Sequence, residues 1–191
     1  MPKRCQWCGD DDLYQRYHDE EWGVPCRDDV RLFEFLILEG AQAGLAWITV
    51  LRKREGYREL FDNFDVNKVA RYSDAKLDRL LQNPAIIRNR LKVYSARQNA
   101  RAFLTLQKEF GSFSDYIWGY VDHKPLQNRF ISMAEVPAST ELSDRISKDL
   151  KKRGFNFVGS TIMYAYLQAC GLVNDHMTDC YRHGDCKKLA Q

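Results

Sequence analysis

Two pairs of cysteine and histidine stand at opposite ends of this 191-residue chain, Cys5 with His18 and His176 with Cys180. Zn²⁺ takes four thiolate or imidazole ligands in a tetrahedron, so a single Cys₂His₂ site would tie the two ends of the chain together. Because four protein ligands leave no open position for water or substrate, a metal held there would stabilise the fold and take no part in a reaction.

The spacing of the cysteines and histidines leaves other sets of metal ligands open. Cys8 forms a C-x₂-C pair with Cys5, and His183 and Cys186 can join Cys180 in a separate C-terminal cluster. Spacing alone therefore indicates a metal site without choosing its ligands.

Composition is that of one soluble domain. A length of 191 residues with 45% hydrophobic and 29% charged residues is ordinary for a globular protein, and we expect a single domain over 1–191. The first residues lack the apolar stretch of a signal peptide, and no run of 18 apolar residues occurs, which predicts a cytoplasmic protein without membrane association. In that compartment the six cysteines are expected to be thiols or metal ligands.

The net charge of +3 conceals an asymmetry along the chain. Residues 1–30 carry four Lys/Arg against eight Asp/Glu, a balance of −4, so residues 31–191 carry +7. A positive balance of this size suits contact with a polyanion such as nucleic acid, and it equally suits ordinary solvated helix faces.

Helical periodicity dominates the chain, which has only five prolines and eleven glycines. The patterns predict helices over residues 28–39, 46–61, 86–110, 143–153 and 160–170. Strand-like alternation is scarce, so the sequence predicts an all-α fold.

A basic helix end, a glycine-bounded turn and a hydroxyl-rich helix start follow one another in residues 151–161. Such a hairpin can offer backbone N–H groups and the positive end of a helix dipole to a phosphate. Gly154 and Ser160 can equally be a plain helix terminator and a plain N-cap, with Phe155 and Phe157 in the core.

Glu39 lies on the apolar stripe of the first long predicted helix, where a carboxylate must find a partner or take up a proton. Glu34 faces elsewhere and is expected to be solvated. Glu39 is either a structural partner of a neighbouring donor or a functional group. The nearby aromatic residues are either core or the walls of a pocket for a flat cationic ring; they are Trp7, Tyr14, Tyr17, Trp22 and Trp47.

These stretches together resemble the 3-methyladenine DNA glycosylase I family of the helix-hairpin-helix superfamily. The matching segments are RCxW at 4–7, YHDxEWGVP at 17–25, LEGxQAGLxWITVL at 38–51, KRGFxFVG at 152–159 and CGLVNDH at 170–176. The resemblance covers nearly the whole chain, and its motifs are long enough to be specific.

The resemblance implies an all-α glycosylase domain whose N- and C-terminal segments, at about 1–25 and 171–186, are tied together by a structural zinc. The family's ligand pattern falls on Cys5, His18, His176 and Cys180. The resemblance also implies that Asp175 supports the structure beside His176 and does not activate the reaction.

The implied activity is hydrolysis of the N-glycosidic bond of 3-methyladenine in alkylated double-stranded DNA, which releases the free base and leaves an abasic site. In that scheme Glu39 is the catalytic residue and favours the cationic base, while Tyr14, Tyr17 and Trp47 surround it. The residues that would contact DNA are Gln42, Gly44 and Leu45 at the duplex, and Lys152, Arg153, Gly154, Gly159 and Ser160 at a phosphate. A monomer is expected.

Two alternatives belong to other classes of protein. A zinc-stabilised module that recognises damaged DNA without cutting it would bind DNA in the same salt-dependent way but would release no base. A zinc hydrolase would lose turnover on metal removal before it lost its fold.

Overall fold

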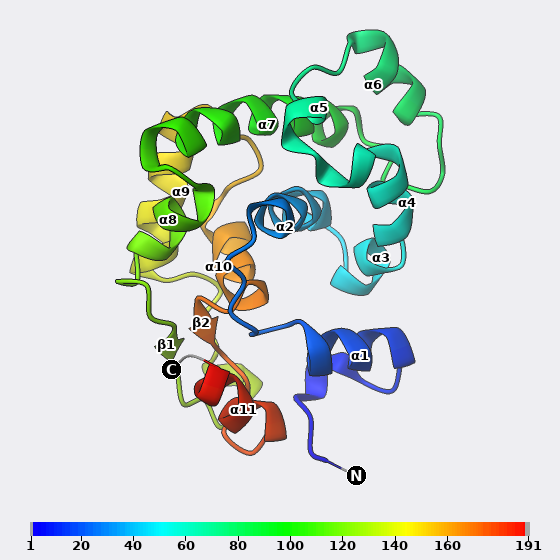
Figure 1. The fold of residues 1–191 in the computed structure, drawn as a ribbon. Coiled ribbons are helices and arrows are strands. Elements are labelled where there is room, and N and C mark those ends of the chain that lie inside the picture. The colour runs from blue at the N-terminus through cyan, green and yellow to red at the C-terminus, as the bar shows by residue number, and fades with distance from the viewer. Residues whose placement is uncertain (1, 190–191) are drawn as a thin grey trace.

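The computed structural model describes residues 2–189, and helices dominate them (Figure 1). The α-helices are α1 (Asp12–Glu20), α2 (Asp29–Gln42), α3 (Trp47–Leu51), α4 (Arg54–Leu60), α5 (Val66–Val69), α6 (Asp74–Leu80), α7 (Arg90–Phe110), α8 (Phe113–Gly119), α9 (Glu141–Lys152), α10 (Ser160–Ala169) and α11 (Tyr181–Leu189). Short 3₁₀ turns lie at Gln6–Cys8, Asp62–Phe64 and Met133–Glu135.

Helix α2 lies at the centre of the molecule and packs against α3, α7, α8 and α10 (Figure 1). The Asp28 carboxylate caps its first turn by accepting the Arg31 amide, and every residue from 32 to 41 is buried. A helix that is apolar on nearly all sides is stable only inside the core, which explains its central place. The prediction of a helix from residue 28 is confirmed, and the helix continues to Gln42.

Helix α7 begins later than the periodicity predicts. The Asn89 side chain accepts the Lys92 amide and caps the helix, so Ile86 lies in the preceding irregular segment although it is buried. Gly111, at φ +89°, ends α7 after Phe110.

The single helix predicted over residues 46–61 is wrong, because the chain forms α3 and α4 with a break at Arg52 and Lys53. The break brings α4 close to the turn before α7. A Cβ atom added to Gly56 would lie 2.4 Å from the carbonyl oxygen of Ala85, so this approach requires glycine.

Glu34 is not solvated, contrary to the sequence-based expectation. Its side chain is buried on the face of α2 that meets α4, where it accepts hydrogen bonds from Arg58 at 2.8 Å. Other elements cover α2 on more sides than its periodicity alone indicated, and Arg58 provides the partner that a buried carboxylate needs.

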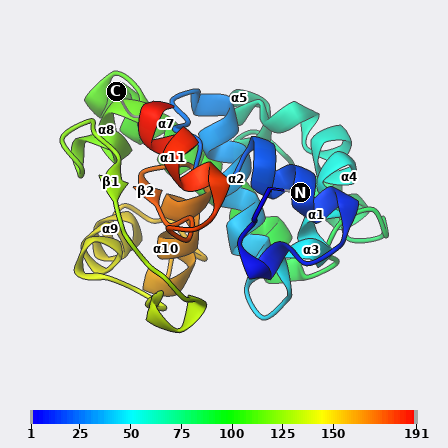
Figure 2. The ribbon, with the colours of Figure 1, turned by 90° about the horizontal axis from the view of Figure 1, so that it is seen from below.

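The fold departs from an all-helical one at a single two-stranded pair among the described residues. Strands β1 (Leu126–Gln127) and β2 (Val173–Asn174) run parallel, with Leu126 opposite Val173. Figure 2 shows this pair beside α11, where it joins the segment after α8 to the C-terminal segment.

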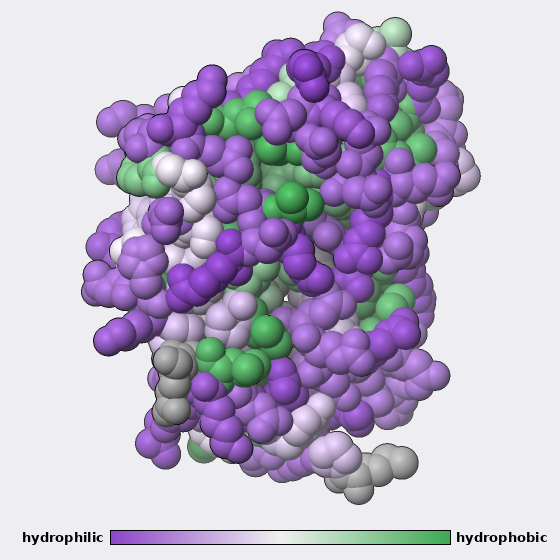
Figure 3. Space-filling view, viewed as in Figure 1, coloured by the Kyte–Doolittle hydropathy of each residue, from purple (hydrophilic) through white to green (hydrophobic). Residues whose placement is uncertain are grey.

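The surface seen in Figure 3 is mainly hydrophilic, with hydrophobic residues in small separate patches. Within residues 2–189, no helix combines the length and the apolar character needed to cross a membrane.

Candidate active site

A pocket with a volume of about 180 Å³ lies between the N-terminal segment, α2, the start of α3 and α10. Its walls combine aromatic rings with a few polar groups, a composition typical of a site for a small flat molecule. The lining residues are Trp7, Tyr14, Tyr17, Trp22, Glu39, Gln42, Trp47, Met133, Val136, Ala165, Gln168 and Asp175.

The aromatic walls come from three different segments and touch one another. Trp7 lies at the centre of one wall, with ring centroids 5.0 Å from both Tyr14 and Trp22. Tyr17 connects this wall to Trp47 at 5.5 Å. The structure therefore brings together the predicted base-binding residues Tyr14, Tyr17 and Trp47 and adds two tryptophans to them.

Glu39 is only 4% exposed and lies in the pocket wall on the last turn of α2. Its carboxyl group has no hydrogen-bond or ion-pair partner within residues 2–189, and burial raises the pKa of this carboxyl to about 8. The hypothesis that a neighbouring donor pairs with Glu39 is therefore wrong for the described residues. A cation that entered the pocket would favour the ionised carboxylate and supply the missing partner.

Glu39 also acts on the tyrosines around it. Burial is the main cause that raises the pKa of Tyr17 well above its usual range, and the nearby charge of Glu39 adds to it. The pKa of Tyr14 is raised mainly by burial, with a further contribution from Glu39. Both phenols are therefore neutral at physiological pH and can act as hydrogen-bond donors.

Two tryptophans of the pocket carry unused donors. The indole Nε1 atoms of Trp7 and Trp47 are buried and have no acceptor within the described part of the chain. A buried donor without an acceptor costs on the order of 1–3 kcal/mol, so a ligand with acceptors on its edge would relieve this cost.

Asp175 is one of the residues that line the pocket, although the resemblance assigned it only to structural support. Its carboxylate is buried and accepts hydrogen bonds from Asn128, which follows β1, and from Tyr164 and Gln168, which lie one turn apart on α10. These bonds join α10 to the segment after β1, so the carboxylate has a structural role as well as a place in the wall.

The sequence motifs indicated some of the pocket-lining residues and gave no indication of others. Trp7 and Trp22 stand within the matched motifs and were candidates for either core or pocket. Met133 and Val136 belong to an irregular segment without periodicity or motif, so only the folded chain reveals that they reach the pocket.

A tight loop at the mouth of the pocket carries the residues that the sequence analysis placed at the DNA duplex. We call residues 42–46 the α2–α3 loop. Gln42 lines the pocket, and its Nε2 atom donates to the carbonyl oxygen of Leu45 at 3.0 Å. Gly44 has φ +79°, which a glycine adopts without strain, and the turn leaves Leu45 37% exposed.

The hairpin between α9 and α10 is held rigidly against α7. Gly154, at φ +90°, ends α9, and the Phe155 amide donates back to the carbonyl oxygen of Leu150. Buried Asn99 of α7 accepts the Asn156 amide at 2.8 Å and donates to the Asn156 carbonyl oxygen at 2.9 Å. The first-turn amides of α10, which follow Gly159, have no partner within their own helix and can receive an acceptor.

The tip of this hairpin meets the end of α2. A Cβ atom added to Gly40 would lie 3.1 Å from the Cβ of Phe157, whose own φ is +56°. The hairpin and the α2–α3 loop are thus neighbours, which places both groups of predicted DNA contacts on one region of the molecule.

The hairpin residues differ in which of their groups are free to contact a phosphate. Lys152 is exposed, whereas the Arg153 guanidinium forms ion pairs with Glu109 and Asp149 at 2.7 Å. Arg153 therefore contributes its backbone and not a free charge. Ser160 is the first residue of α10 and not its N-cap, which is Gly159.

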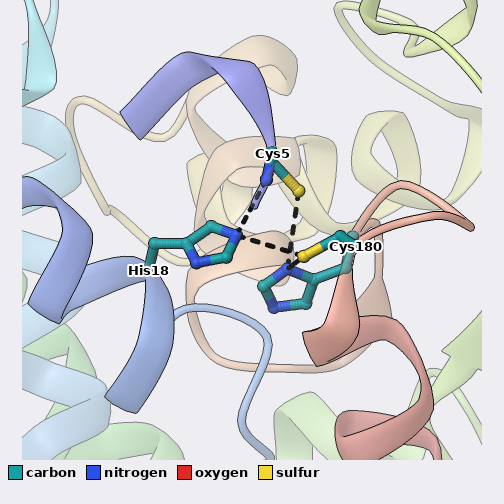
Figure 4. Close-up of side chains that lie close together, drawn as sticks. Cys5, His18 and Cys180 are labelled. Carbon is teal, nitrogen blue, oxygen red and sulfur yellow. Dashed lines mark hydrogen bonds between the residues drawn. The ribbon is translucent and has the colours of Figure 1, made fainter. Parts of the chain in front are cut away.

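A second cluster lies directly behind the aromatic wall. Figure 4 shows Cys5, His18 and Cys180 pointing from three separate segments toward one centre. With His176 they form a buried group of four, whose potential ligand atoms all lie within 4.8 Å of one another.

The spacing of these atoms fits a tetrahedral metal. The sulfur–nitrogen distances are 3.6 Å from Cys5 Sγ to His176 Nδ1, 3.5 Å from Cys180 Sγ to His18 Nε2 and 3.7 Å from Cys180 Sγ to His176 Nδ1. Zinc bonds of about 2.3 Å to sulfur and about 2.0 Å to nitrogen place neighbouring sulfur and nitrogen ligands roughly 3.5 Å apart.

The other ring nitrogen of each histidine is also held, as is usual at metal sites. His18 Nδ1 lies 2.8 Å from the Asp19 carboxylate, and His176 Nε2 lies 2.9 Å from the Trp22 carbonyl oxygen. These contacts fix both rings with their remaining nitrogen atoms toward the centre of the cluster.

The competing ligands from the sequence analysis lie outside this group of four. The Cys8 thiol donates to the carbonyl oxygen of Cys5 at 3.1 Å, and His183 Nε2 lies 2.9 Å from the Asn128 carbonyl oxygen. Cys186 is buried and likewise lies outside the group.

Known proteins resemble this chain over nearly its whole length. The family model of methyladenine glycosylases matches residues 7–183. DNA-3-methyladenine glycosylase 1 of Escherichia coli is 51% identical over 178 residues, which are 93% of this chain and 95% of the relative.

Solved structures show the same likeness in three dimensions. A crystal structure of 3-methyladenine DNA glycosylase I superposes with a TM-score of 0.92 at 51% identity, covering 94% of this chain and 98% of the other. A structure of the Staphylococcus aureus enzyme, described for its recognition of 3-methyladenine, superposes with a TM-score of 0.91 at 36% identity, covering 93% and 95%. This chain therefore belongs to the methyladenine glycosylase family.

Proposed function

We propose that this protein hydrolyses the N-glycosidic bond of 3-methyladenine in alkylated double-stranded DNA, in the first step of base-excision repair. Membership of the family and the activity for which its relatives are named support the reaction. Within this chain the observation that carries the proposal is Glu39, a buried carboxyl group that lies beside aromatic rings and has no partner in the described part of the chain.

Methylation at N3 gives the adenine ring a positive charge while it is attached to the sugar, and this charge makes the base a good leaving group. As the bond between C1′ and the base breaks, the base leaves with the bonding electrons as neutral 3-methyladenine. A water oxygen forms the new bond to C1′ and loses a proton, which leaves an abasic site. The protein must chiefly take the base out of the stack and distinguish it from normal bases.

Glu39 and the aromatic wall supply that distinction. A carboxylate that burial has stripped of water gains most from a cation, whereas a neutral adenine leaves the same charge without compensation. The rings of Tyr14, Tyr17 and Trp47 offer faces on which a flat cationic base can stack. We therefore assign base binding to these four residues and the catalytic contribution to Glu39.

DNA is held by the surface around the pocket. In this scheme Gln42, Gly44 and Leu45 enter the duplex where the base leaves, with Leu45 as an apolar wedge. The hairpin from Lys152 to Ser160 receives a phosphate through the backbone amides from Gly159 onward and through the charge of Lys152, whereas the Gly154 amide already donates to the carbonyl oxygen of Lys151. Such a phosphate contact does not depend on the base sequence. The protein acts as a monomer in the cytoplasm.

We further propose that Cys5, His18, His176 and Cys180 hold zinc. The ion supplies stability through four protein ligands and leaves the hydrolysis to the pocket. It ties the segments at about 1–25 and 171–186 into one domain that spans 1–191 and belongs to the helix-hairpin-helix superfamily.

The direct test is the release of free base from DNA methylated at adenine N3, with unmethylated DNA of the same sequence as the control. We expect 3-methyladenine and an abasic site from the methylated duplex only. Binding of methylated DNA by the folded protein without release of base would replace this proposal with a module that recognises damage without cutting.

A further inference from the structure

The α2–α3 loop needs an external support, because a five-residue turn at the surface has few contacts of its own. Two internal bonds close the turn: the Gln42 side chain donates to the Leu45 carbonyl oxygen, and the Leu45 amide donates to the Gln42 carbonyl oxygen at 2.7 Å. Both bonds join the same two residues, and Gly44 between them adds backbone freedom. If this loop enters the DNA, its position relative to the pocket must be fixed before the DNA arrives.

Lys92 provides such a support from another helix. Its Nζ atom donates to the carbonyl oxygens of Ala41 and Ala43, each at 2.7 Å. These carbonyls flank Gln42 at the end of α2, where the last carbonyl groups of a helix have no partner within it. Lys92 lies in the first turn of α7, so two long helices are joined at this point.

We propose that Lys92 is a positioning residue that holds the α2–α3 loop in the geometry required to extract the damaged base. The inference rests on the proposed function, since it assigns a task to the loop that only a base-extracting protein needs. It concerns a residue that the sequence motifs do not include.

Charge and burial favour this role over a direct contact with DNA. The ammonium group is partly buried, and burial lowers the pKa of Lys92. Two of its three donors are already committed to carbonyl oxygens, and a cation at a helix C-terminus is favoured by the helix dipole. A lysine that served mainly as a phosphate contact would extend into solvent.

The test compares Lys92→Met, which keeps the length of the side chain and removes its donors, with Lys92→Arg, which can still donate to two carbonyl oxygens. Arg101→Met is the matched control: Arg101 also lies on α7, near its middle, and also donates to a backbone carbonyl oxygen, that of Ala70. The measurements are single-turnover release of 3-methyladenine from methylated duplex DNA, binding of free 3-methyladenine, and hydrogen exchange at the loop amides.

We expect Lys92→Met to reduce kcat/KM on duplex DNA about tenfold or more, since small displacements of positioning groups are costly. Exchange at the Leu45 amide should accelerate in the free protein, while binding of free 3-methyladenine changes less than about twofold because most of the pocket lining is untouched. Lys92→Arg should restore most of the activity, and Arg101→Met should match the wild type.

Other results would overturn the inference. Unchanged exchange at the loop amides, with a shallower salt dependence of DNA affinity in Lys92→Met, would identify Lys92 as a phosphate contact. Wild-type activity in Lys92→Met would show that the loop needs no such support. Failure of the wild type itself to release base would instead contradict the proposed function.

Discussion

At the scale of single residues, the same burial that makes Glu39 useful also makes it costly. In the unfolded chain a glutamate ionises near its usual pKa of 4.5, whereas the folded protein retains the proton until about pH 8. The folded state therefore binds more protons than the unfolded state between these two values, and its stability falls as the pH rises through this range.

The first prediction follows from this difference. Glu39→Gln removes the ionisable group, so the variant should gain stability over the wild type as the pH rises from about 4.5 to about 8. A shift of this size corresponds to at most about 5 kcal/mol at 1.36 kcal/mol per pH unit. Denaturant unfolding of both proteins at pH 5 and pH 8 measures how the difference between their free energies of unfolding changes with pH. An equal difference at the two pH values would show that Glu39 ionises normally in the folded protein.

At the scale of elements, the Cys/His cluster and the pocket share the same segments. Cys5 begins the turn that carries Trp7, Tyr17 precedes His18 in α1, and Asp175 precedes His176. The ring of Trp22 lies 4.7 Å from that of His176, so the aromatic wall rests directly on the cluster. A metal in the cluster would hold the wall in place without touching the base.

Cys5→Ser should accordingly lower the bound zinc and the melting temperature, and it should weaken binding of free 3-methyladenine because Trp7 loses its anchor. Base release should persist in the fraction that remains folded. Cys8→Ser is the control, since Cys8 lies outside the four-residue group. The metal content and the melting temperature of both variants are measured. Loss of the metal in Cys8→Ser with full metal content in Cys5→Ser would show that Cys8 and not Cys5 is the ligand.

Elements also show where sequence patterns were sufficient. Helices α2 and α9 begin at side-chain caps and α10 begins after Gly159, and the structure places all three within a few residues of the predicted bounds. The break between α3 and α4 allows Gly56 to approach Ala85, a contact between distant segments that local periodicity does not encode. Glu34 was misplaced for the same reason, because its partner Arg58 belongs to another helix.

At the scale of the whole molecule, the pocket is built from segments that lie far apart in the chain. The acidic N-terminal segment supplies aromatic rings, the central helix supplies Glu39, and the segments around Met133 and Asp175 close the remaining walls. The motifs predicted the aromatic rings and the carboxyl group, since those residue types reveal their chemistry. Met133 and Val136 could not be predicted, because only packing brings an irregular segment to the site.

We propose that Glu39, whose carboxyl group has no partner within residues 2–189, drives excision of the cationic base. The most direct measurement is the single-turnover release of 3-methyladenine from methylated duplex DNA by the wild type, Glu39→Gln and Glu34→Gln. The last variant is matched, because Glu34 is a buried carboxylate on the same helix that is paired with Arg58 outside the pocket.

Glu39→Gln should slow release on the order of 100-fold, the usual cost of removing one electrostatic partner from an active site. Glu34→Gln should keep a rate near that of the wild type at a temperature where all three proteins are folded. Equal rates for Glu39→Gln and the wild type would contradict the account.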